Sequence, residues 1–215
     1  MHHLHEILAS LPSHVRLVVV SKTIQPDVLM EVYRSGHRAF GENRAQELIT
    51  KQPLLPPDIQ WHFIGHLQTN KVKYIAPFVE MIESVDSLKL LKEINKEAAK
   101  NDRVIKCLLQ FHIAEEETKY GLDMQEAKDI LTCPDFSAMK NIIICGVMGM
   151  ATFTDEADQV RQEFRKLKKN FDELKDKYFP DDPSFCEISM GMSGDYQIAV
   201  EEGSTMVRIG SAIFH

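Results

Sequence analysis

Lys22 directly follows the apolar run Leu17 to Ser21. If that run is a buried strand, the lysine stands at its carboxyl end with its stem inside the fold. Burial disfavours an ammonium group, lowers the pKa of a lysine and leaves a neutral amine that attacks carbonyl carbons. Such an amine forms Schiff bases. The alternative is a lysine whose charged end extends into water, and for this residue taken alone that alternative is favoured.

Two short loops near the C-terminus have residue types that bind anions. One contains Ser193-Gly194-Asp195 and follows Gly191, and the other contains Gly210-Ser211. Free backbone amides at helix starts, together with serine hydroxyls, surround a phosphate without a basic surface. Glycine lets the backbone approach a ligand closely. Helix capping by Ser193 and a tight turn at Gly210 explain either loop by itself, whereas the two together favour phosphate binding.

Three further polar residues have two interpretations each. Arg208 alternates with Val207 and Ile209, so either the arginine or its two neighbours point inward. An inward Arg208 needs a partner, which is a bound ligand or an acidic residue in a salt bridge. His62 lies inside a predicted strand, where a histidine is more often a hydrogen-bonded core residue than a catalyst. Asn43 follows Glu42 and is expected to cap the next helix.

The elements that position these residues alternate between short apolar runs and longer segments of helical period, which is typical of parallel α/β proteins. The predicted strands are Arg16 to Ser21, Arg38 to Gly41, Gln60 to Ile64, Met81 to Val85, Ile105 to Phe111, Ile142 to Met148, Phe185 to Met190 and Met206 to Ile209. The predicted helices are Gln25 to Ser35, Asn43 to Lys51, Thr69 to Ala76, Ser87 to Lys100, Met124 to Leu131, Asp155 to Tyr178 and Gly194 to Glu202. Asp86 and Thr154 are expected as helix caps.

Eight such strands most naturally close into a single (β/α)₈ TIM-type barrel over residues 1–215, and a doubly wound open sheet is the alternative. In a barrel the reacting groups gather at the carboxyl ends of the strands. Lys22, Arg208 and the two glycine loops all follow or end predicted strands. We therefore expect them at one mouth, with the phosphate beside the last two strands, where barrels commonly bind it.

Composition limits the possible partners. The chain has 215 residues and a formal net charge of −7, which argues against broad binding to nucleic acid. Its apolar runs are too short to cross a bilayer, and its first residues do not resemble a secretory signal, so we expect a cytoplasmic protein. The four cysteines form no CxxC pair, so no metal site is expected. No exposed apolar helical stripe stands out, which favours a monomer.

Several stretches occur together in an order that resembles the pyridoxal phosphate homeostasis protein family, the YggS or PROSC type. They are Val18 to Thr23, Phe40 to Asn43, Trp61 to Gly65 with Leu67-Gln68 and Asn70-Lys71, Ser189 to Ser193 with Asp195, and Gly203 to Thr205 followed by Gly210. The resemblance implies a barrel similar to the N-terminal domain of alanine racemases, with pyridoxal 5′-phosphate bound as an aldimine to Lys22. It also implies phosphate contacts from Ser193, Gly210 and Ser211, a ring-nitrogen contact from Arg208, and pocket positions for Asn43 and His62.

The family resemblance implies a role in cofactor homeostasis without substantial catalytic turnover, in which bound cofactor is passed to apo-enzymes. An arginine at the ring nitrogen weakens the ring as an electron sink, which fits that role. One enzyme alternative is a pyridoxal phosphate-dependent amino-acid racemase, although we expect no second domain to supply an opposing acid or base. Another is a Schiff-base aldolase for a phosphorylated sugar, for which the sequence shows no evident set of inward acid and base groups.

Overall fold

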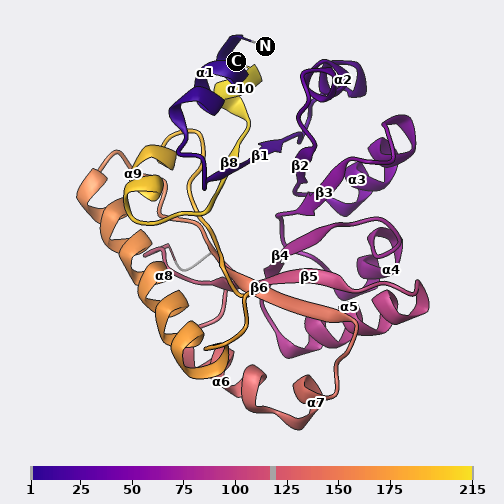
Figure 1. Ribbon diagram of the computed structural model, residues 1–215, viewed down its shortest axis with the longest axis vertical. Helices are drawn as coiled ribbons and strands as arrows, with labels where there is room; N and C mark the ends of the chain where they lie inside the picture. The colour runs from indigo at the N-terminus through magenta and orange to yellow at the C-terminus, as the bar shows by residue number, and fades with distance from the viewer. Residues whose placement is uncertain (1, 117–119, 215) are drawn as a thin grey trace.

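Eight parallel strands form a closed barrel in chain order, with β1 hydrogen-bonded to both β2 and β8 (Figure 1). The computed structural model describes residues 2–116 and 120–214. The strands are β1 Arg16–Val20, β2 Ala39–Glu42, β3 Gln60–Phe63, β4 Met81–Val85, β5 Ile105–Phe111, β6 Ile142–Gly149, β7 Glu187–Ser189 and β8 Met206–Ile209. The predicted (β/α)₈ barrel is confirmed. Because β1 pairs with β8, the sheet has no free edges and the open-sheet alternative is excluded.

Helical segments follow every strand and cover the outside of the barrel (Figure 1). They are α1 His2–Ser10, α2 Pro26–Arg34, α3 Ala45–Lys51, η1 Gln52–Leu54, η2 Thr69–Lys71, α4 Val72–Ile75, α5 Leu88–Lys100, α6 Met124–Thr132, α7 Pro134–Ser137, α8 Ala157–Tyr178, α9 Tyr196–Glu201 and α10 Ser211–Phe214. The long helix α8 and the short α9 pack on the side of the barrel formed by β6 to β8 (Figure 1). The predicted helix over residues 69–76 begins as a 3₁₀ turn and continues as one turn of α-helix.

Two of the predicted helix caps are wrong. The cap of α5 is Ser87, whose side chain accepts a hydrogen bond from the amide of Leu90, and not Asp86. At α8 the preceding residue is Glu156, without a side-chain cap, while the Thr154 hydroxyl accepts from the Glu156 amide. Both differences are shifts of one or two residues, because several adjacent polar residues are each able to cap and packing decides which one does.

The strand side chains divide into two apolar clusters. A small cluster fills the barrel interior and consists of Val18, Met81, Leu108, Cys145, Met148 and Met206. A much larger one lies between the strands and the helices and contains Phe40, Trp61 and Phe63. On β8, Val207 and Ile209 belong to the outer cluster while Met206 belongs to the inner one, so the alternation points Arg208 into the barrel.

The two ends of the described chain lie together. Helix α1 packs against α10, with Leu4, Ile7 and Ile213 buried there (Figure 1). Cys107 and Cys145 are buried, and burial raises the pKa of the Cys145 thiol to about 11. Within residues 2–116 and 120–214, no helix is long and apolar enough to cross a membrane.

Candidate functional site

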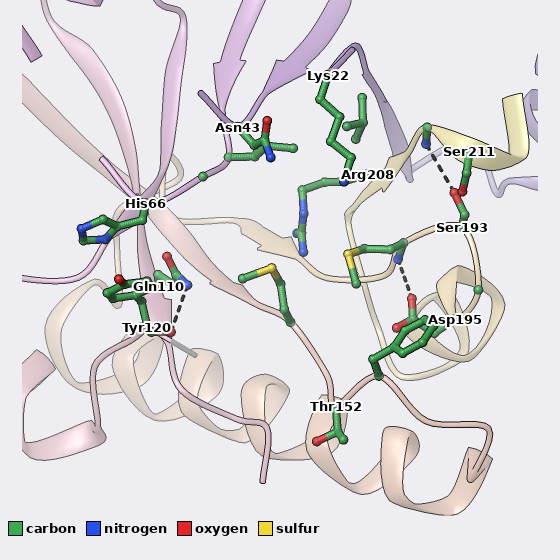
Figure 2. A pocket seen from close by; sticks show the side chains of 18 of the residues that line it. Lys22, Asn43, His66, Gln110, Tyr120, Thr152, Ser193, Asp195, Arg208 and Ser211 are labelled. Atoms are coloured by element: carbon green, nitrogen blue, oxygen red, sulfur yellow. Dashed lines mark hydrogen bonds between the residues drawn. The ribbon is translucent and has the colours of Figure 1, made fainter. Parts of the chain in front are cut away.

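A cavity of about 600 Å³ opens at the carboxyl ends of the strands. Six of the seven predicted site residues line it: Lys22, Asn43, Ser193, Arg208, Gly210 and Ser211. Figure 2 shows Lys22 and Arg208 approaching the middle of the cavity, with Ser193 and Ser211 together on one side. The seventh residue, His62, is buried and is not among the lining residues. The expectation that His62 lies in the pocket is therefore corrected.

Lys22 is the second residue after the end of β1, and its side chain reaches into the cavity (Figure 2). The position agrees with the prediction, but the expected burial does not. Lys22 is exposed, because the cavity around it is open and water-accessible. Desolvation of the ammonium group is thus not what distinguishes this lysine. What distinguishes it is that its side chain points into the cavity (Figure 2). The next residue, Thr23, has a φ of 64°.

The loops after β7 and β8 meet through the Ser193 hydroxyl. Its oxygen accepts hydrogen bonds from the backbone amides of Gly210 and Ala212, at 3.4 and 3.3 Å. Ser193 therefore does not cap α9, as one of the interpretations held. Among the described hydrogen bonds none uses the amides of Gly194 or Ser211. Hydroxyls and backbone amides from two loops converge here, which is an arrangement that holds a small anion.

Two of the glycines in these loops have a packing role, and one of them, Gly210, also lines the cavity. Gly191 has a φ of 98°, and a Cβ there would lie 2.6 Å from the Ala199 Cβ in α9. A Cβ on Gly210 would lie 3.0 Å from both the Cβ and the carbonyl oxygen of Val20 in β1. Gly194 is different, because a Cβ there meets nothing within 4 Å. Gly191 and Gly210 therefore let the loops pack closely on their neighbours, and the close approach of Gly194 and Gly210 to a ligand stays a prediction.

Arg208 enters the cavity from a hydrogen-bonded network below its floor. Its guanidinium donates to the Ser189 hydroxyl at 2.6 Å and to the Gly149 carbonyl at 3.1 Å. Ser189 in turn donates to Glu83 at 2.5 Å, and the other oxygen of Glu83 lies 2.6 Å from His62 Nδ1. All four side chains are buried. The acidic partner that an inward arginine needs is thus Glu83, mainly through Ser189, since the direct Arg208–Glu83 distance is 4.0 Å.

The charges in this network support each other. Desolvation raises the pKa of the Glu83 carboxyl, but the hydrogen bond and charge of His62, together with Arg208 and Ser189, hold it below its usual value. Desolvation lowers the pKa of Arg208, and the charges of Glu83 and Asp195 oppose this effect. Glu83 is therefore an anion, and a guanidinium stays charged in proteins. His62 acts on the cavity only indirectly, by holding the carboxylate that pairs with Arg208.

Asn43 lines the cavity on the side away from Ser193 and Ser211 (Figure 2), and it does not cap a helix. The cap position of α3 is Arg44. The Asn43 side-chain oxygen is buried and has no hydrogen-bond partner among the described residues. A buried, unpaired acceptor is costly, so its presence in a cavity wall indicates a place where a polar ligand group donates.

Sequence reasoning missed the residues on the side of the cavity away from the loops of Ser193 and Ser211. His66 stacks on Tyr120 with ring centroids 4.0 Å apart, and the Gln110 amide donates to the Tyr120 carbonyl (Figure 2). Met150 and Thr152 continue this wall. The rule that reactive groups follow the strands finds them once it is applied to the ends of β3, β5 and β6. Within the described chain, no group of three or more His, Cys, Asp or Glu residues is placed to hold a metal ion.

Comparison with known proteins gives consistent matches over the whole barrel. The family model described as alanine racemase, N-terminal domain, matches residues 1–215. A protein of Aquifex aeolicus named pyridoxal phosphate homeostasis protein is 40% identical over 93% of this chain and 86% of its own length. One of Homo sapiens with the same name is also 40% identical, over 93% of this chain and 75% of its own length.

Solved structures agree with these sequence matches. PipY of Synechococcus elongatus, determined with PLP bound, superposes with a TM-score of 0.89 at 33% identity, over 100% of this chain and 99% of its own. An alanine racemase of Clostridium difficile has a TM-score of 0.76 at 14% identity and is covered over 55% of its length. At that identity the second likeness concerns the fold alone.

Proposed function

The chain belongs to the pyridoxal phosphate homeostasis protein family, and we propose that it binds pyridoxal 5′-phosphate as a Schiff base on Lys22 and takes part in homeostasis of this cofactor. The observation that carries the proposal is the convergence of three kinds of group on one cavity. An amine, a pair of anion-binding loops and a buried guanidinium come from β1, from the loops after β7 and β8, and from β8 itself.

The residues present fit each part of the cofactor. The loops of Ser193 and Ser211 suit its phosphate, and the Lys22 amine suits its aldehyde. Asn43 offers an unpaired acceptor to a polar substituent. Arg208 is the charged group available to the ring nitrogen. When bound, the cofactor supplies an electron-withdrawing ring to an amine attached to it. The relative PipY, whose structure was determined with PLP, spans the same fold.

We propose further that turnover on amino acids is slight. Arg208 is a cation in a fixed position, because its guanidinium donates a hydrogen bond to Ser189, which in turn donates to the buried carboxylate of Glu83. A cation at the ring nitrogen keeps that nitrogen unprotonated and weakens the ring as an electron sink. This reasoning, and the name of the relatives, support a binding and release function over the racemase alternative. Transfer to apo-enzymes, a monomeric state and a cytoplasmic location stay predictions.

The Lys22→Ala variant tests the site. We expect the wild-type protein to show visible absorbance when pyridoxal 5′-phosphate is added, because a Schiff base conjugated to the ring absorbs there, and the variant to fold yet lose this band. The matched control is Lys166→Ala, which removes an exposed lysine from α8. A band of equal strength in the Lys22→Ala protein would assign the cofactor to another lysine. The same holo-protein should give no amino-acid turnover at ordinary enzyme rates of about 1 to 10³ per second.

A further inference from the structure

A second lysine, Lys51, is buried behind Lys22, in the layer between the barrel wall and α3. It is the last residue of α3 and only 6% exposed. Its ammonium group donates to Glu42 at 2.6 Å, to Glu47 at 2.7 Å and to the carbonyl oxygen of Ser21 at 2.6 Å. Two carboxylates and a carbonyl thus bind the three protons of one amine. This lysine is held as a cation and does not line the cavity of Lys22.

Lys51, Glu42 and Glu47, here called the Lys51 cluster, form hydrogen bonds to the chain on both sides of Lys22. On the N-terminal side, Lys51 binds the Ser21 carbonyl, and the Ser21 hydroxyl donates to Glu42 at 2.8 Å. On the C-terminal side, the amide of Thr23 donates to Glu47 at 2.6 Å. One charge cluster therefore fixes the residues before and after Lys22. Lys51 contributes to both sides, because it binds the Ser21 carbonyl directly and holds Glu47, which accepts from Thr23.

The backbone conformation at Thr23 requires contacts that hold it in place. Thr23 has a φ of 64°, a left-handed conformation that is unfavourable for a β-branched residue and that persists only where the surroundings enforce it. Burying a lysine and a glutamate is also costly, and apolar residues of similar size often pack as well or better. Apolar residues would therefore attach α3 to the barrel at least as stably as this cluster does. Its specific effect is on the direction in which the chain leaves β1.

We propose that Lys51, acting through Glu42 and Glu47, is a positioning residue for Lys22: it fixes the backbone from Ser21 to Thr23 so that the Lys22 side chain enters the cavity. This inference rests on the proposed role of Lys22 in holding the cofactor. Lys51 touches no ligand itself. Its loss should leave Arg208 and the loops of Ser193 and Ser211 in place. Although β8 pairs with β1, the hydrogen bonds of Arg208 go to Ser189 and Gly149, and those of Ser193 come from Gly210 and Ala212, so none of them involves the Lys51 cluster.

The test separates positioning of Lys22 from general binding. The variant is Glu42→Gln/Lys51→Met, which avoids leaving an unpaired buried carboxylate, and Lys168→Met, which breaks an exposed ion pair with Asp172, is the control. One ligand is pyridoxal 5′-phosphate, followed by its visible band. The other is pyridoxine 5′-phosphate, which has the phosphate and ring but no aldehyde, followed by calorimetry. A third measurement is hydrogen exchange at the Thr23 amide.

We expect the double variant to form the Schiff base at least about tenfold more weakly, since a small misplacement of a reacting group has a large effect. It should bind pyridoxine 5′-phosphate within about twofold of the wild type, because Lys51 and Glu42 make no hydrogen bond to the loops of Ser193 and Ser211. The Thr23 amide should exchange at least about tenfold faster once Glu47 has lost its lysine. The control should match the wild type in all three measurements.

Three outcomes would overturn the positioning role: a Schiff base of wild-type strength, an equal loss of both ligands, or unchanged protection of the Thr23 amide. Failure of the proposed function looks different, because then the wild-type protein itself shows no visible band. In that case the exchange at Thr23 still decides whether Lys51 fixes this part of the chain. If the double variant does not fold, Glu47→Gln, at a partly exposed position, tests the contact on the C-terminal side of Lys22.

Discussion

Two buried glutamates, Glu42 on β2 and Glu83 on β4, face opposite sides of the barrel wall. Glu42 ends β2 and points outward toward α3, where it meets Lys51 and Ser21. Glu83 lies within β4 and points into the barrel, where it meets His62, Ser189 and Arg208. Each is fully buried, and each pairs with a buried cation and a serine hydroxyl.

Their pKa values nevertheless shift in opposite directions. Burial raises the pKa of Glu42 above its usual value, and the hydrogen bonds from Lys51 and Ser21 offset this only in part. Burial acts on Glu83 in the same sense, but its partners more than offset it, so its pKa is lowered. The charge of Glu47 also raises the pKa of Glu42, whereas both His62 and Arg208 lower that of Glu83. The two carboxylates differ as well in the second oxygen. Both oxygens of Glu83 are hydrogen-bonded, whereas Glu42 Oε2 has no partner among the described residues.

The contribution of a buried charge to stability thus depends on how completely its polar atoms are hydrogen-bonded. The network of Glu83 is complete and holds a functional cation, Arg208, at a fixed place in the cavity floor. The network of Glu42 is incomplete, and its cation Lys51 has a second carboxylate in Glu47. We therefore expect the inner network to contribute more to stability and to tolerate less change than the outer one.

Removal of the two carboxylates should give the largest difference. Glu83→Ala leaves both His62 and Arg208 buried without their anion, and breaking such a buried pair costs about 3–5 kcal/mol of unfolding free energy. Glu42→Ala leaves Lys51 still paired with Glu47, so we expect about 1.5–3 kcal/mol, the contribution of hydrogen bonds to a charged group. Urea unfolding of both variants measures the two losses.

The control for these variants is Asp172→Ala, which removes one partner of an exposed ion pair in α8 and should cost less than about 1 kcal/mol. If Glu42→Ala proves as damaging as Glu83→Ala, then Glu47 does not compensate for Glu42. The completeness of the inner network would in that case not be what sets its contribution.

Removal of the two serine hydroxyls should give a smaller difference in the same direction. Ser189 accepts from Arg208 and donates to Glu83, so Ser189→Ala leaves two buried charged groups short of a partner and should cost about 1–3 kcal/mol. Ser21→Ala removes one donor from an oxygen of Glu42 that keeps Lys51, and about 0.5–1.5 kcal/mol is expected. Thermal unfolding ranks the two variants, and a larger loss for Ser21→Ala would reverse the ranking of the networks.

Much of the barrel was predictable from the sequence, because each strand is an apolar run bounded by polar residues. The limits of β4, β5 and β8 agree with the prediction to the residue. Lys22, Ser193 and Ser211 were predictable as well, since a residue that follows a strand lies at the cavity whatever the details of packing. Position along a strand thus carries most of the information about this kind of site.

The two glutamate networks were not predictable in the same way. Whether Arg208 points inward depends on the register of β8 against its neighbours, and the sequence left that open. Ser189 and Glu83 are 106 positions apart, and no local pattern relates them. Lys51 lies at the end of an ordinary amphipathic helix, where a lysine is normally solvated. Its burial follows only from how α3 packs beside β2, which brings Lys51 to the Ser21 carbonyl after β1.

The smallest effect, and the one that separates the two glutamates by sign, is the dependence of stability on pH. A carboxyl whose pKa is lowered by folding stabilises the native state above the pKa of the unfolded chain, and this contribution is lost as the pH falls through the native value. Glu83 is of this kind, with His62 and Arg208 as the charged groups that face it. A carboxyl whose pKa is raised does the reverse: its contribution is present below the unfolded value and is lost as the pH rises through the native one. Glu42 is of this kind, with Lys51 and Glu47 around it.

Unfolding of the wild type, Glu83→Gln and Glu42→Gln should therefore be compared on both sides of 4.5, the ordinary value for both carboxyls. The wild type's advantage over Glu83→Gln should be constant above this pH and shrink below it. Its advantage over Glu42→Gln should be constant below this pH and shrink above it. The glutamine variants keep the size of the native side chain and one acceptor oxygen but do not titrate, so the pH dependence of each difference reports the proton of that carboxyl. Two curves that bend in the same direction would show that pairing of the second oxygen does not decide the sign. The contrast between the inner and outer networks would then have to come from their different distances to solvent.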